Sequence, residues 1–339
     1  MSTNSNNFLK PNYFTHIYVE EEIIDHPRTK QILCRFPRAK TIIITHYKDV
    51  FNRTHQSFLH QKNSPNLILA KKHGELILKG APVCQGFGEE YFYYTSSIMN
   101  CLYDCEYCYL QGMYPSANLV VFVNLEDIFS KVAELLQYHK VYLCISYDTD
   151  LLALEGLFGF VLAWCEFAKD HTDLTIEIRT KSANEVALKT LPVLPNVIYA
   201  FTLSPETIIK NYEHGTPSLF ARMKAIKTAL SLGHPVRLCF DPMIYVANYK
   251  KVYEDFFHYL WTKISPDSIR DISLGVFRVS KDYLKRMRKQ RPQSAILQYP
   301  YEPEEGVAHY GRDITNEMMD FAYQILSECY DKDRIFVWE

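Results

Sequence analysis

Three of the nine cysteines, Cys101, Cys105 and Cys108, lie close together in the segment CLYDCEYC. Nine cysteines scattered at random over 339 residues would give this spacing roughly 0.006 times, so the cluster indicates a binding site. Zinc normally takes its fourth ligand from a second pair of Cys or His residues, and no CxxC or HxxxH follows downstream. An iron–sulfur cube bound entirely by protein also needs four cysteines. Three thiolates without a fourth therefore favour a cluster with one open iron, with a zinc site or structural thiols as alternatives.

The other six cysteines are dispersed, and most lie in apolar segments, such as Cys144 in VYLCIS and Cys239 in VRLCFD. This setting is typical of buried thiols that behave as small hydrophobic side chains. The odd count in a chain of this length argues against a disulfide framework and favours a reducing cytoplasm. The polar, uncharged opening MSTNSNNF predicts no signal peptide.

Composition places the chain among ordinary globular proteins, with 47% apolar and 22% charged residues. These proportions exclude a disordered chain, a collagen and a heptad rod. The net charge of −2 draws the protein toward neither nucleic acid nor membrane, so a nucleic-acid partner requires a local basic patch. The longest apolar run, residues 151–167, contains Glu155 and predicts a buried helix, so no membrane partner is expected.

Strand-like runs alternate with helical segments around and after the cysteine loop, as expected for βα units and a parallel sheet. Six such units predict an α/β fold, a partial (βα)6 TIM-type barrel, with the cysteine loop at the carboxyl end of the first strand. The predicted strands are residues 91–97, 141–146, 174–180, 197–203, 236–240 and 272–277. The predicted helices are residues 151–169, 184–191, 217–232 and 249–263.

The first part of the chain lacks this regular alternation. Residues 1–85 are expected to form an N-terminal α/β extension packed on the barrel, and residues 86–339 the barrel itself. The extension has a strand-like run at residues 41–45. The segment NLILAKKHGELILKG is expected to form a β-hairpin that turns at His73 and Gly74.

CxxxCxxC after the first strand of a partial barrel is the signature of the radical S-adenosylmethionine enzymes, and this chain resembles the spore photoproduct lyase family in particular. The likeness runs from about residue 90 to the end of the chain. It is carried by the segments CLYDCEYCYLQ, NLEDIF, SYDTD, RTK at residues 179–181, IIKNYEHGT, DPM at residues 241–243 and the C-terminal RVSK.

The resemblance implies a DNA repair lyase that reverses spore photoproduct, 5-thyminyl-5,6-dihydrothymine, to two thymines. The implied cofactors are a [4Fe–4S] cluster on Cys101, Cys105 and Cys108, and S-adenosylmethionine on its fourth iron. Reduction of the cluster releases a 5′-deoxyadenosyl radical, which takes a hydrogen atom from the lesion. Positions matching cofactor-binding residues of the family are Tyr109, Thr149, Lys181, Ser204 and Asp241. Ser204 and Asp241 could instead be helix caps or turn residues, and Lys181 a solvated lysine.

The family's hydrogen-donating cysteine is missing from this chain, because Tyr147 stands at its position. Cys144 lies three residues earlier, and an odd offset along a strand points to the opposite face, so it cannot substitute. A phenol can also give up a hydrogen atom. Tyr147 is therefore the expected donor, with Tyr107 or Tyr109 as relay, unless Tyr147 only packs against the lesion.

A DNA surface is expected in the C-terminal part of the chain, where KDYLKRMRKQR carries six basic residues. Arg278, Lys281, Lys285 and Arg286 are the predicted phosphate contacts, with a solvated helix face as the alternative. The resemblance also implies a C-terminal β-hairpin, followed by a helix, that prises the lesion out of the duplex. Residues 299–312 match its place, and their Tyr310 and Arg312 are the predicted wedge and phosphate contact.

The predicted partners are double-stranded DNA carrying the thymine lesion and an electron donor such as flavodoxin or ferredoxin. The expected place of action is the cytoplasm of a spore or germinating cell. Two other functions remain open from the sequence. One is a radical S-adenosylmethionine enzyme acting on a peptide or metabolite. The other is a zinc-stabilised nucleic-acid-binding module without catalysis.

Overall fold

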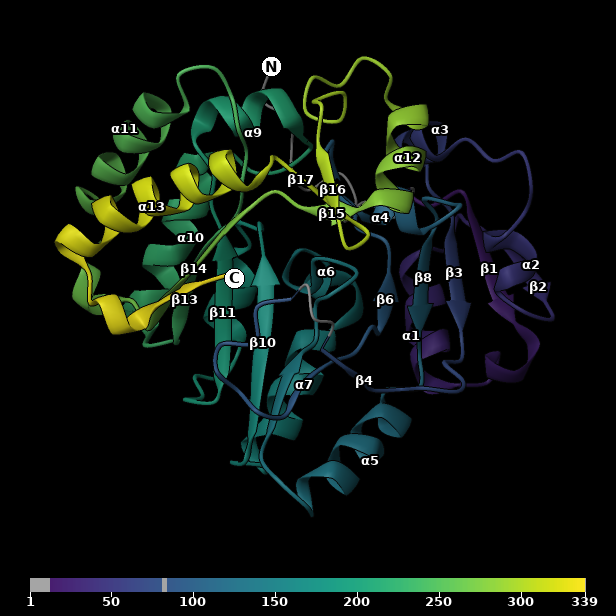
Figure 1. Cartoon of the computed structure of the whole chain (residues 1–339). Coiled ribbons are helices and arrows are strands. Elements are labelled where there is room, and N and C mark those ends of the chain that lie inside the picture. The colour runs from purple at the N-terminus through teal and green to yellow at the C-terminus, as the bar shows by residue number, and fades with distance from the viewer. Residues whose placement is uncertain (1–12, 81–83, 339) are drawn as a thin grey trace.

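The larger of two main sheets curls into a partial barrel in the computed structural model, which describes residues 13–80 and 84–338 (Figure 1). Seven of its eight strands run parallel, and β4 at one edge is antiparallel to β5. In spatial order they are β18 (Ile335–Val337), β14 (Asp271–Val276), β13 (Val236–Met243), β11 (Val197–Thr202), β10 (Leu174–Thr180), β9 (Val141–Cys144), β5 (Phe92–Tyr94) and β4 (Leu78–Lys79). The six predicted barrel strands are β5, β9, β10, β11, β13 and β14, so the predicted partial barrel is confirmed.

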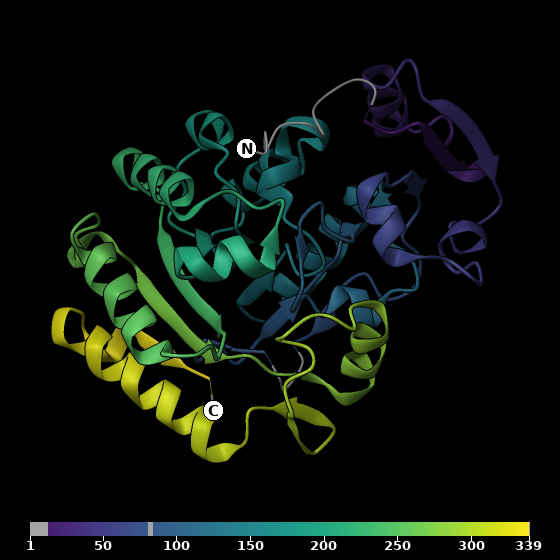
Figure 2. The same cartoon turned by 90° about the horizontal axis from the view of Figure 1, so that it is seen from above.

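Helices cover the outer face of this curved sheet, as the view from above shows for α10 and α11 in green and α13 in yellow (Figure 2). Each buries an apolar face against the strands, which is the usual layering of βα units. The barrel helices are α5 (Leu125–Leu136), α6 (Leu151–Phe158), α7 (Phe160–Lys169), α8 (Glu185–Thr190), α9 (Glu206–Tyr212), α10 (Leu219–Leu232), α11 (Tyr249–Trp261) and α13 (Arg312–Cys329).

The helix predicted at residues 151–169 is in fact two helices, α6 and α7, bent by 98° at Gly159. Gly159 has φ of 67°, a left-handed conformation that glycine adopts at low cost. The carboxylate of Glu155 then accepts hydrogen bonds from the amides of Val161 (2.7 Å) and Leu162 (3.0 Å), which caps the second helix. In the part of the chain that is described, no single helix is long and apolar enough to span a membrane. The bent pair α6 and α7 together reaches that length and apolar composition, and nothing beyond length and composition points to a membrane span.

A second sheet, on the right of Figure 1, contains most of the N-terminal part of the chain. Its strands, in order, are β2 (Lys40–Ile44), β1 (His16–Glu20), β3 (Leu67–Ala70), β8 (Leu119–Phe122) and β6 (Ile98–Met99). The first four are parallel, and β6 is antiparallel to β8. The helices of this region are α1 (Pro27–Arg35), α2 (Lys48–Phe51) and α3 (Phe58–Asn63).

The prediction of a β-hairpin that turns at His73 and Gly74 is wrong. Strand β3 pairs in parallel with β1 and β8 in the second sheet, whereas β4 joins the barrel sheet. All four residues of β3 are buried, which suits a central strand covered on both faces and not a hairpin with one exposed face. The second sheet also takes β6 and β8 from beyond residue 86, so the predicted division at residue 85 does not coincide with the division between the sheets.

The C-terminal part forms the expected hairpin and helix. Strands β16 (Glu302–Glu304) and β17 (Val307–His309) are antiparallel, and β15 (Val279–Ser280) adds to β17. The two turn residues, Glu305 and Gly306, both have positive φ, as a two-residue hairpin turn requires. Helix α12 (Lys281–Gln290) follows β15 and packs on the short helix α4 (Leu110–Met113) that ends the cysteine loop.

Candidate functional site

The cysteine loop lies near the carboxyl ends of the barrel strands and is tied down from three sides. Its short strand β7 (Asp104–Cys105) pairs antiparallel with β12 (Glu213–His214), which follows α9. Lys62, on α3 of the second sheet's helices, donates to the carbonyls of Cys101 (2.6 Å) and Tyr103 (2.7 Å). On the third side Arg291, which follows α12, binds the carboxylate of Asp104. The loop is therefore positioned before any ligand arrives.

The pKa values of the three thiols in the loop are raised by burial, and those of Cys101 and Cys105 also by the charge of the other loop cysteines. Burial raises the pKa of Cys101 to about 11, partly opposed by the charge of Lys62. Burial also raises the pKa of Cys105 and of Cys108, and the neighbouring ammonium of Lys181 works against this in both. Three thiolates formed here thus need compensating positive charge, and the nearby ammonium of Lys181 supplies part of it.

Among residues 13–80 and 84–338, no three His, Cys, Asp or Glu side chains are arranged to hold a single metal ion. A zinc ion draws its sulfur ligands onto one centre, whereas a cube binds each cysteine through a separate iron. Thr149 Oγ1 is buried without a hydrogen-bond partner among the described residues, as expected for a hydroxyl that awaits a polar ligand.

One buried aspartate, Asp150, positions the segments that carry Thr149 and Lys181. Asp150 accepts hydrogen bonds from Thr180 Oγ1 (2.8 Å), from the amide of Lys181 (2.7 Å) and from the amide of Ala153 (3.0 Å). It thereby caps α6 and joins the end of β9 to the end of β10. The ammonium of Lys181 lies 5.4 Å from the centre of the Tyr107 ring and makes no hydrogen bond within the described chain. An ammonium so placed can pair with an incoming carboxylate.

Tyr107 and Ser204 both contact Glu213, a fully buried carboxylate next to the cysteine loop. Tyr107 donates its hydroxyl hydrogen to Glu213, and Ser204 Oγ donates at 3.2 Å. Arg222 on α10, equally buried, forms an ion pair with the same carboxylate. Burial alone would raise the pKa of Glu213, but Arg222 and Lys181 outweigh it and lower the pKa to about 2. Sequence reasoning found Tyr107 and Ser204 but missed this ion pair.

Tyr109 and Tyr147 lie close together, with their ring centroids 6.0 Å apart. The hydroxyl of Tyr109 donates to the carbonyl of Tyr147 at 2.8 Å, and Asp148 Oδ1 lies 3.4 Å from the same hydroxyl. The ring of Tyr94 stacks on that of Tyr147 with centroids 4.3 Å apart. Burial raises the pKa of Tyr147, with Cys84 as the next contribution, so its phenol stays protonated at neutral pH.

Cys84 is the partner of Tyr147 that sequence reasoning missed. Its sulfur lies 2.8 Å from the Tyr147 hydroxyl oxygen, and either group can be the donor. The loop that carries it is anchored at Gln85, whose amide donates to the carbonyl of Val337 at 2.8 Å. Phe87 in the same loop stacks on the guanidinium of Arg237 inside the barrel, 3.4 Å from ring centre to Cζ. A single cysteine without a second cysteine nearby gave no spacing signal.

Asp241 lies toward the end of β13, as expected, but it is already paired. Arg278 donates to its carboxylate at 3.0 Å, and a guanidinium nitrogen of Arg179 lies 3.8 Å away. Arg278 also lies over the ring of Trp338, 3.8 Å from the centroid, and its side chain is 10% exposed. The structure thus contradicts the prediction that Arg278 is a surface contact for DNA phosphate.

The family model described as spore photoproduct lyase matches residues 89–313 of the chain. The chain belongs to the spore photoproduct lyase family. A curated spore photoproduct lyase from Clostridium acetobutylicum is 26% identical over 257 residues, which cover 72% of this chain and 73% of that protein. This membership argues against the two other functions that the sequence left open.

Solved structures of spore photoproduct lyase share the fold. One complexed with dinucleoside spore photoproduct has a TM-score of 0.84 and 18% identity, over 97% of this chain and 99% of that chain. Another, a mutant with bound AdoMet and dinucleoside spore photoproduct, has a TM-score of 0.81 and 18% identity over the same shares. At this identity the likeness establishes the fold alone.

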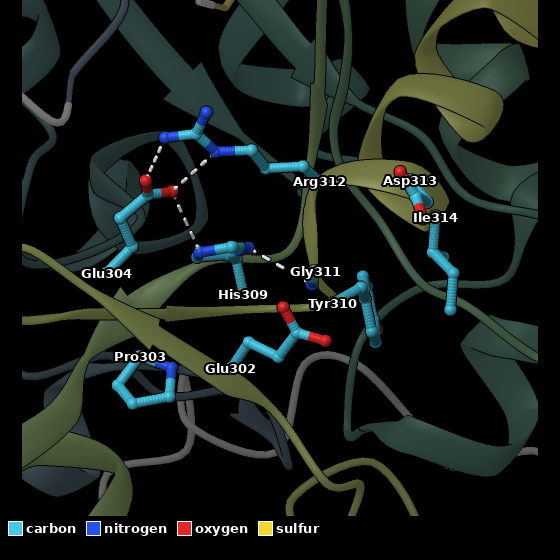
Figure 3. A pocket seen from close by; sticks show the side chains of 9 residues that line it. All are labelled: Glu302, Pro303, Glu304, His309, Tyr310, Gly311, Arg312, Asp313 and Ile314. Atoms are coloured by element: carbon cyan, nitrogen blue, oxygen red, sulfur yellow. Dashed lines mark hydrogen bonds and ion pairs between the residues drawn. The ribbon is translucent and has the colours of Figure 1, made fainter.

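The hairpin of this spore photoproduct lyase family member does not present the two residues predicted to act on DNA. Tyr310 is buried at 3% exposure among aromatic rings, where its hydroxyl accepts a hydrogen bond from the amide of Tyr245 at 3.1 Å. This burial contradicts the role of wedge. Arg312 is exposed, but both it and His309 contact the carboxylate of Glu304 beside a cavity of about 510 Å³ (Figure 3). A phosphate would have to displace that carboxylate.

Helix α12 keeps part of the predicted basic surface. Lys281, Lys285 and Arg286 are exposed on it, and so is Lys289. Arg288 instead donates to the carbonyls of Leu297 and Tyr299, both at 2.7 Å, and so has a structural role. Of the six basic residues in the segment, only Lys281, Lys285, Arg286 and Lys289 are therefore exposed.

Proposed function

We propose that this protein is a DNA repair lyase that converts spore photoproduct into two thymines. The observation that carries the proposal is the loop of three cysteines beside Lys181 at the end of a partial barrel, in a chain of the spore photoproduct lyase family. The reaction adds no atoms overall, since a hydrogen atom is taken from the lesion, the linking carbon–carbon bond breaks, and a hydrogen atom is returned.

Cys101, Cys105 and Cys108 would hold a [4Fe–4S] cluster, and Tyr109, Thr149, Lys181, Ser204 and Asp241 would line the S-adenosylmethionine site. When bound, this pair of cofactors supplies a 5′-deoxyadenosyl radical at the expense of one electron. Lys181 would pair with the carboxylate of the methionine part, and Thr149 would hydrogen bond to it. The aromatic rings around Tyr109 exclude water, which protects a radical from side reactions.

The hydrogen atom that completes the repair would come from the pair formed by Cys84 and Tyr147. A thiol and a phenol both give up a hydrogen atom readily, and here the two are in hydrogen-bond contact at 2.8 Å. This pair replaces the cysteine that the family has at the position of Tyr147. Tyr107 and Tyr109 remain candidate relays, and Tyr109 is the better placed because it contacts the backbone of Tyr147 directly.

The substrate would be the lesion within double-stranded DNA, swung out of the helix into the site. The exposed face of α12 supports this, because Lys281, Lys285 and Arg286 are all exposed on this one helix. An electron donor such as flavodoxin or ferredoxin, and the cytoplasm of a spore or germinating cell, complete the proposal. Arg312 would bind phosphate only after release from Glu304.

Replacing Lys281, Lys285 and Arg286 together with alanine should weaken duplex binding by about tenfold at low salt, since each loses one phosphate contact. The slope of the logarithm of the binding constant against the logarithm of the salt concentration should become shallower by about two to three. Fluorescence anisotropy with a labelled duplex at several salt concentrations measures both. The matched control removes three exposed lysines at Lys140, Lys189 and Lys251, and equal weakening in this control would argue against a specific surface.

The function itself is tested by an anaerobic assay with reductant, S-adenosylmethionine and the dinucleotide form of spore photoproduct. The expected products are thymine dinucleotide and 5′-deoxyadenosine, measured by chromatography. If the reconstituted protein is brown and forms 5′-deoxyadenosine but does not repair the lesion, it is a radical enzyme that acts on a different substrate. A colourless protein containing zinc would overturn the proposed chemistry altogether.

A further inference from the structure

A cavity of about 330 Å³ lies outside the cysteine loop, between the second sheet and the barrel. Its walls come from the loops after β2 and β3, from β5 and from the end of α4. Tyr94 and Asp148 also line it. These two residues belong equally to the site described above, because Tyr94 stacks on Tyr147 and Asp148 contacts Tyr109. The cavity therefore borders the place where the lesion would be repaired.

The topology of the second sheet favours a ligand at this position. Strand β1 is flanked by β2 on one side and β3 on the other, all parallel, so the chain reverses its direction of winding at β1. Ligands of open parallel sheets bind at the carboxyl ends of strands beside such a switch point. Glu20 at the end of β1 is 1% exposed, and its carboxylate accepts from the amides of Tyr47 and Lys71, both at 2.7 Å. The two wall-forming loops are thus already fixed.

The charges that face the cavity favour an anion. Lys48, Lys71 and Lys72 line it, together with two histidines, against the carboxylates of Glu75 and Asp148. The carboxylate of Asp148 is satisfied internally, by Ser96, by Tyr114 at 2.8 Å and by Tyr109. Lys72 donates to the carbonyl of Ser96 at 2.7 Å.

The cations of the cavity differ in how far they are engaged. Outside the cavity, Glu22 approaches Lys71 at 3.9 Å and His73 at 2.7 Å, both at the exposed rim. Lys48 forms no ion pair within the described chain, and its ammonium lies 5.8 Å from the ring centre of Tyr47. Lys48 is thus the cation most available to an incoming phosphate, and Lys71 lines the same cavity.

Aromatic rings provide the second half of the binding surface. Tyr47, Tyr94, Tyr114 and Phe122 line the same cavity. Stacking of a base on such rings is worth about 1–3 kcal/mol and tolerates any base. Cations at the rim with aromatic rings inside are the combination that binds single-stranded nucleic acid, where the backbone follows the charges and the bases stack.

We propose that this cavity binds one nucleotide of the damaged strand, directly next to the lesion, with its phosphate at Lys48 and Lys71 and its base on the aromatic rings. The inference rests on the proposed function, because Tyr94 and Asp148 line the cavity and also belong to the proposed lesion site. A nucleotide held here fixes the strand after the lesion has left the helix. Repair of a lesion within an oligonucleotide then gains from contacts that an isolated dinucleotide cannot make.

The test compares two substrates, the dinucleotide lesion and the same lesion centred in a single-stranded oligonucleotide. For the Lys48→Ala, Lys71→Ala double variant, the ratio of kcat/KM for the oligonucleotide to that for the dinucleotide should fall about tenfold, mostly through KM. The matched control is Lys140→Ala with Lys189→Ala, two exposed lysines elsewhere, which should keep the wild-type ratio. An unchanged ratio in the first variant, or an equal fall in the control, overturns the inference.

Failure of the proposed function is seen separately, since wild-type protein would then repair neither substrate. In that case anisotropy with an undamaged labelled oligonucleotide still decides the inference. Binding that weakens about tenfold in the Lys48→Ala, Lys71→Ala variant, and not in the control, supports the site. Binding that is equal in wild type and both variants contradicts it.

Discussion

Replacing Cys84 with alanine should cut the yield of repaired thymine by about tenfold or more, while 5′-deoxyadenosine continues to form. The reason is that the Cys84 thiol and the Tyr147 phenol contact each other at 2.8 Å, and the lesion radical needs a hydrogen atom back after its linking bond breaks. Without that hydrogen atom the radical persists and reacts with other groups. By-products should therefore rise as thymine falls, and chromatography of the dinucleotide products measures both.

The variant Cys84→Ser separates hydrogen transfer from hydrogen bonding. A serine hydroxyl can still bond to Tyr147, but its O–H bond is too strong to give a hydrogen atom to a carbon radical. Cys84→Ser should thus fail as Cys84→Ala does, and Tyr147→Phe should also divert products. Cys34→Ala is the matched control, since Cys34 is an exposed thiol on α1. Wild-type thymine yield from Cys84→Ser would remove Cys84 from hydrogen transfer.

Replacing Arg222 with methionine should lower the free energy of unfolding by about 3–5 kcal/mol, because it leaves the buried carboxylate of Glu213 without its partner. Both side chains of this ion pair are fully buried. Chemical denaturation, followed by circular dichroism, measures the loss. Iron content after reconstitution should fall as well, because Glu213 lies on β12, which pairs with the cysteine loop.

A second change makes the Arg222 experiment specific. Adding Glu213→Gln to Arg222→Met removes the unpaired charge and should recover part of the lost stability, which a double-mutant cycle quantifies. The control is Lys224→Met on the same helix, whose exposed ion pair with Glu185 should contribute less than about 1 kcal/mol. A loss below about 1 kcal/mol for Arg222→Met would contradict the argument.

The same pair predicts how stability depends on pH. The pKa of Glu213 is about 2 in the folded protein, against an ordinary value of 4.5. As the pH falls, the unfolded chain therefore binds a proton at Glu213 before the folded protein does. The stabilisation by this ion pair is thus fully present above pH 4.5 and is lost as the pH falls toward 2. Arg222→Met should weaken this dependence, because burial still raises the pKa of Glu213 and Arg222 no longer lowers it.

The barrel could be predicted from the sequence because its strands are short apolar runs separated by helices of regular length. The run at residues 174–180 coincides with β10. The same reasoning failed for β3 and β4, where two runs separated by a glycine turn looked like one hairpin. Local sequence cannot tell which sheet a strand joins, since pairing with β1 and β8 depends on residues distant in the chain.

The cysteines and Lys181 could be predicted because close spacing, or a family motif, identifies them. Cys84 could not, since its partner Tyr147 lies 63 residues away and only the anchored loop brings them together. Arg278 and Tyr310 show the opposite error. Their residue types suit DNA contact, but residue type does not indicate direction, and both side chains point into the protein to satisfy Asp241 and Tyr245.

The anchoring of the cysteine loop constrains when the protein can receive iron during its synthesis. The contacts that hold the loop come from Lys62, from His214 on β12 and from Arg291, the last of them 187 residues away from its partner Asp104. A nascent chain still attached to the ribosome lacks Arg291 until most of the barrel has emerged. Cluster assembly should therefore follow translation, on a nearly completed molecule.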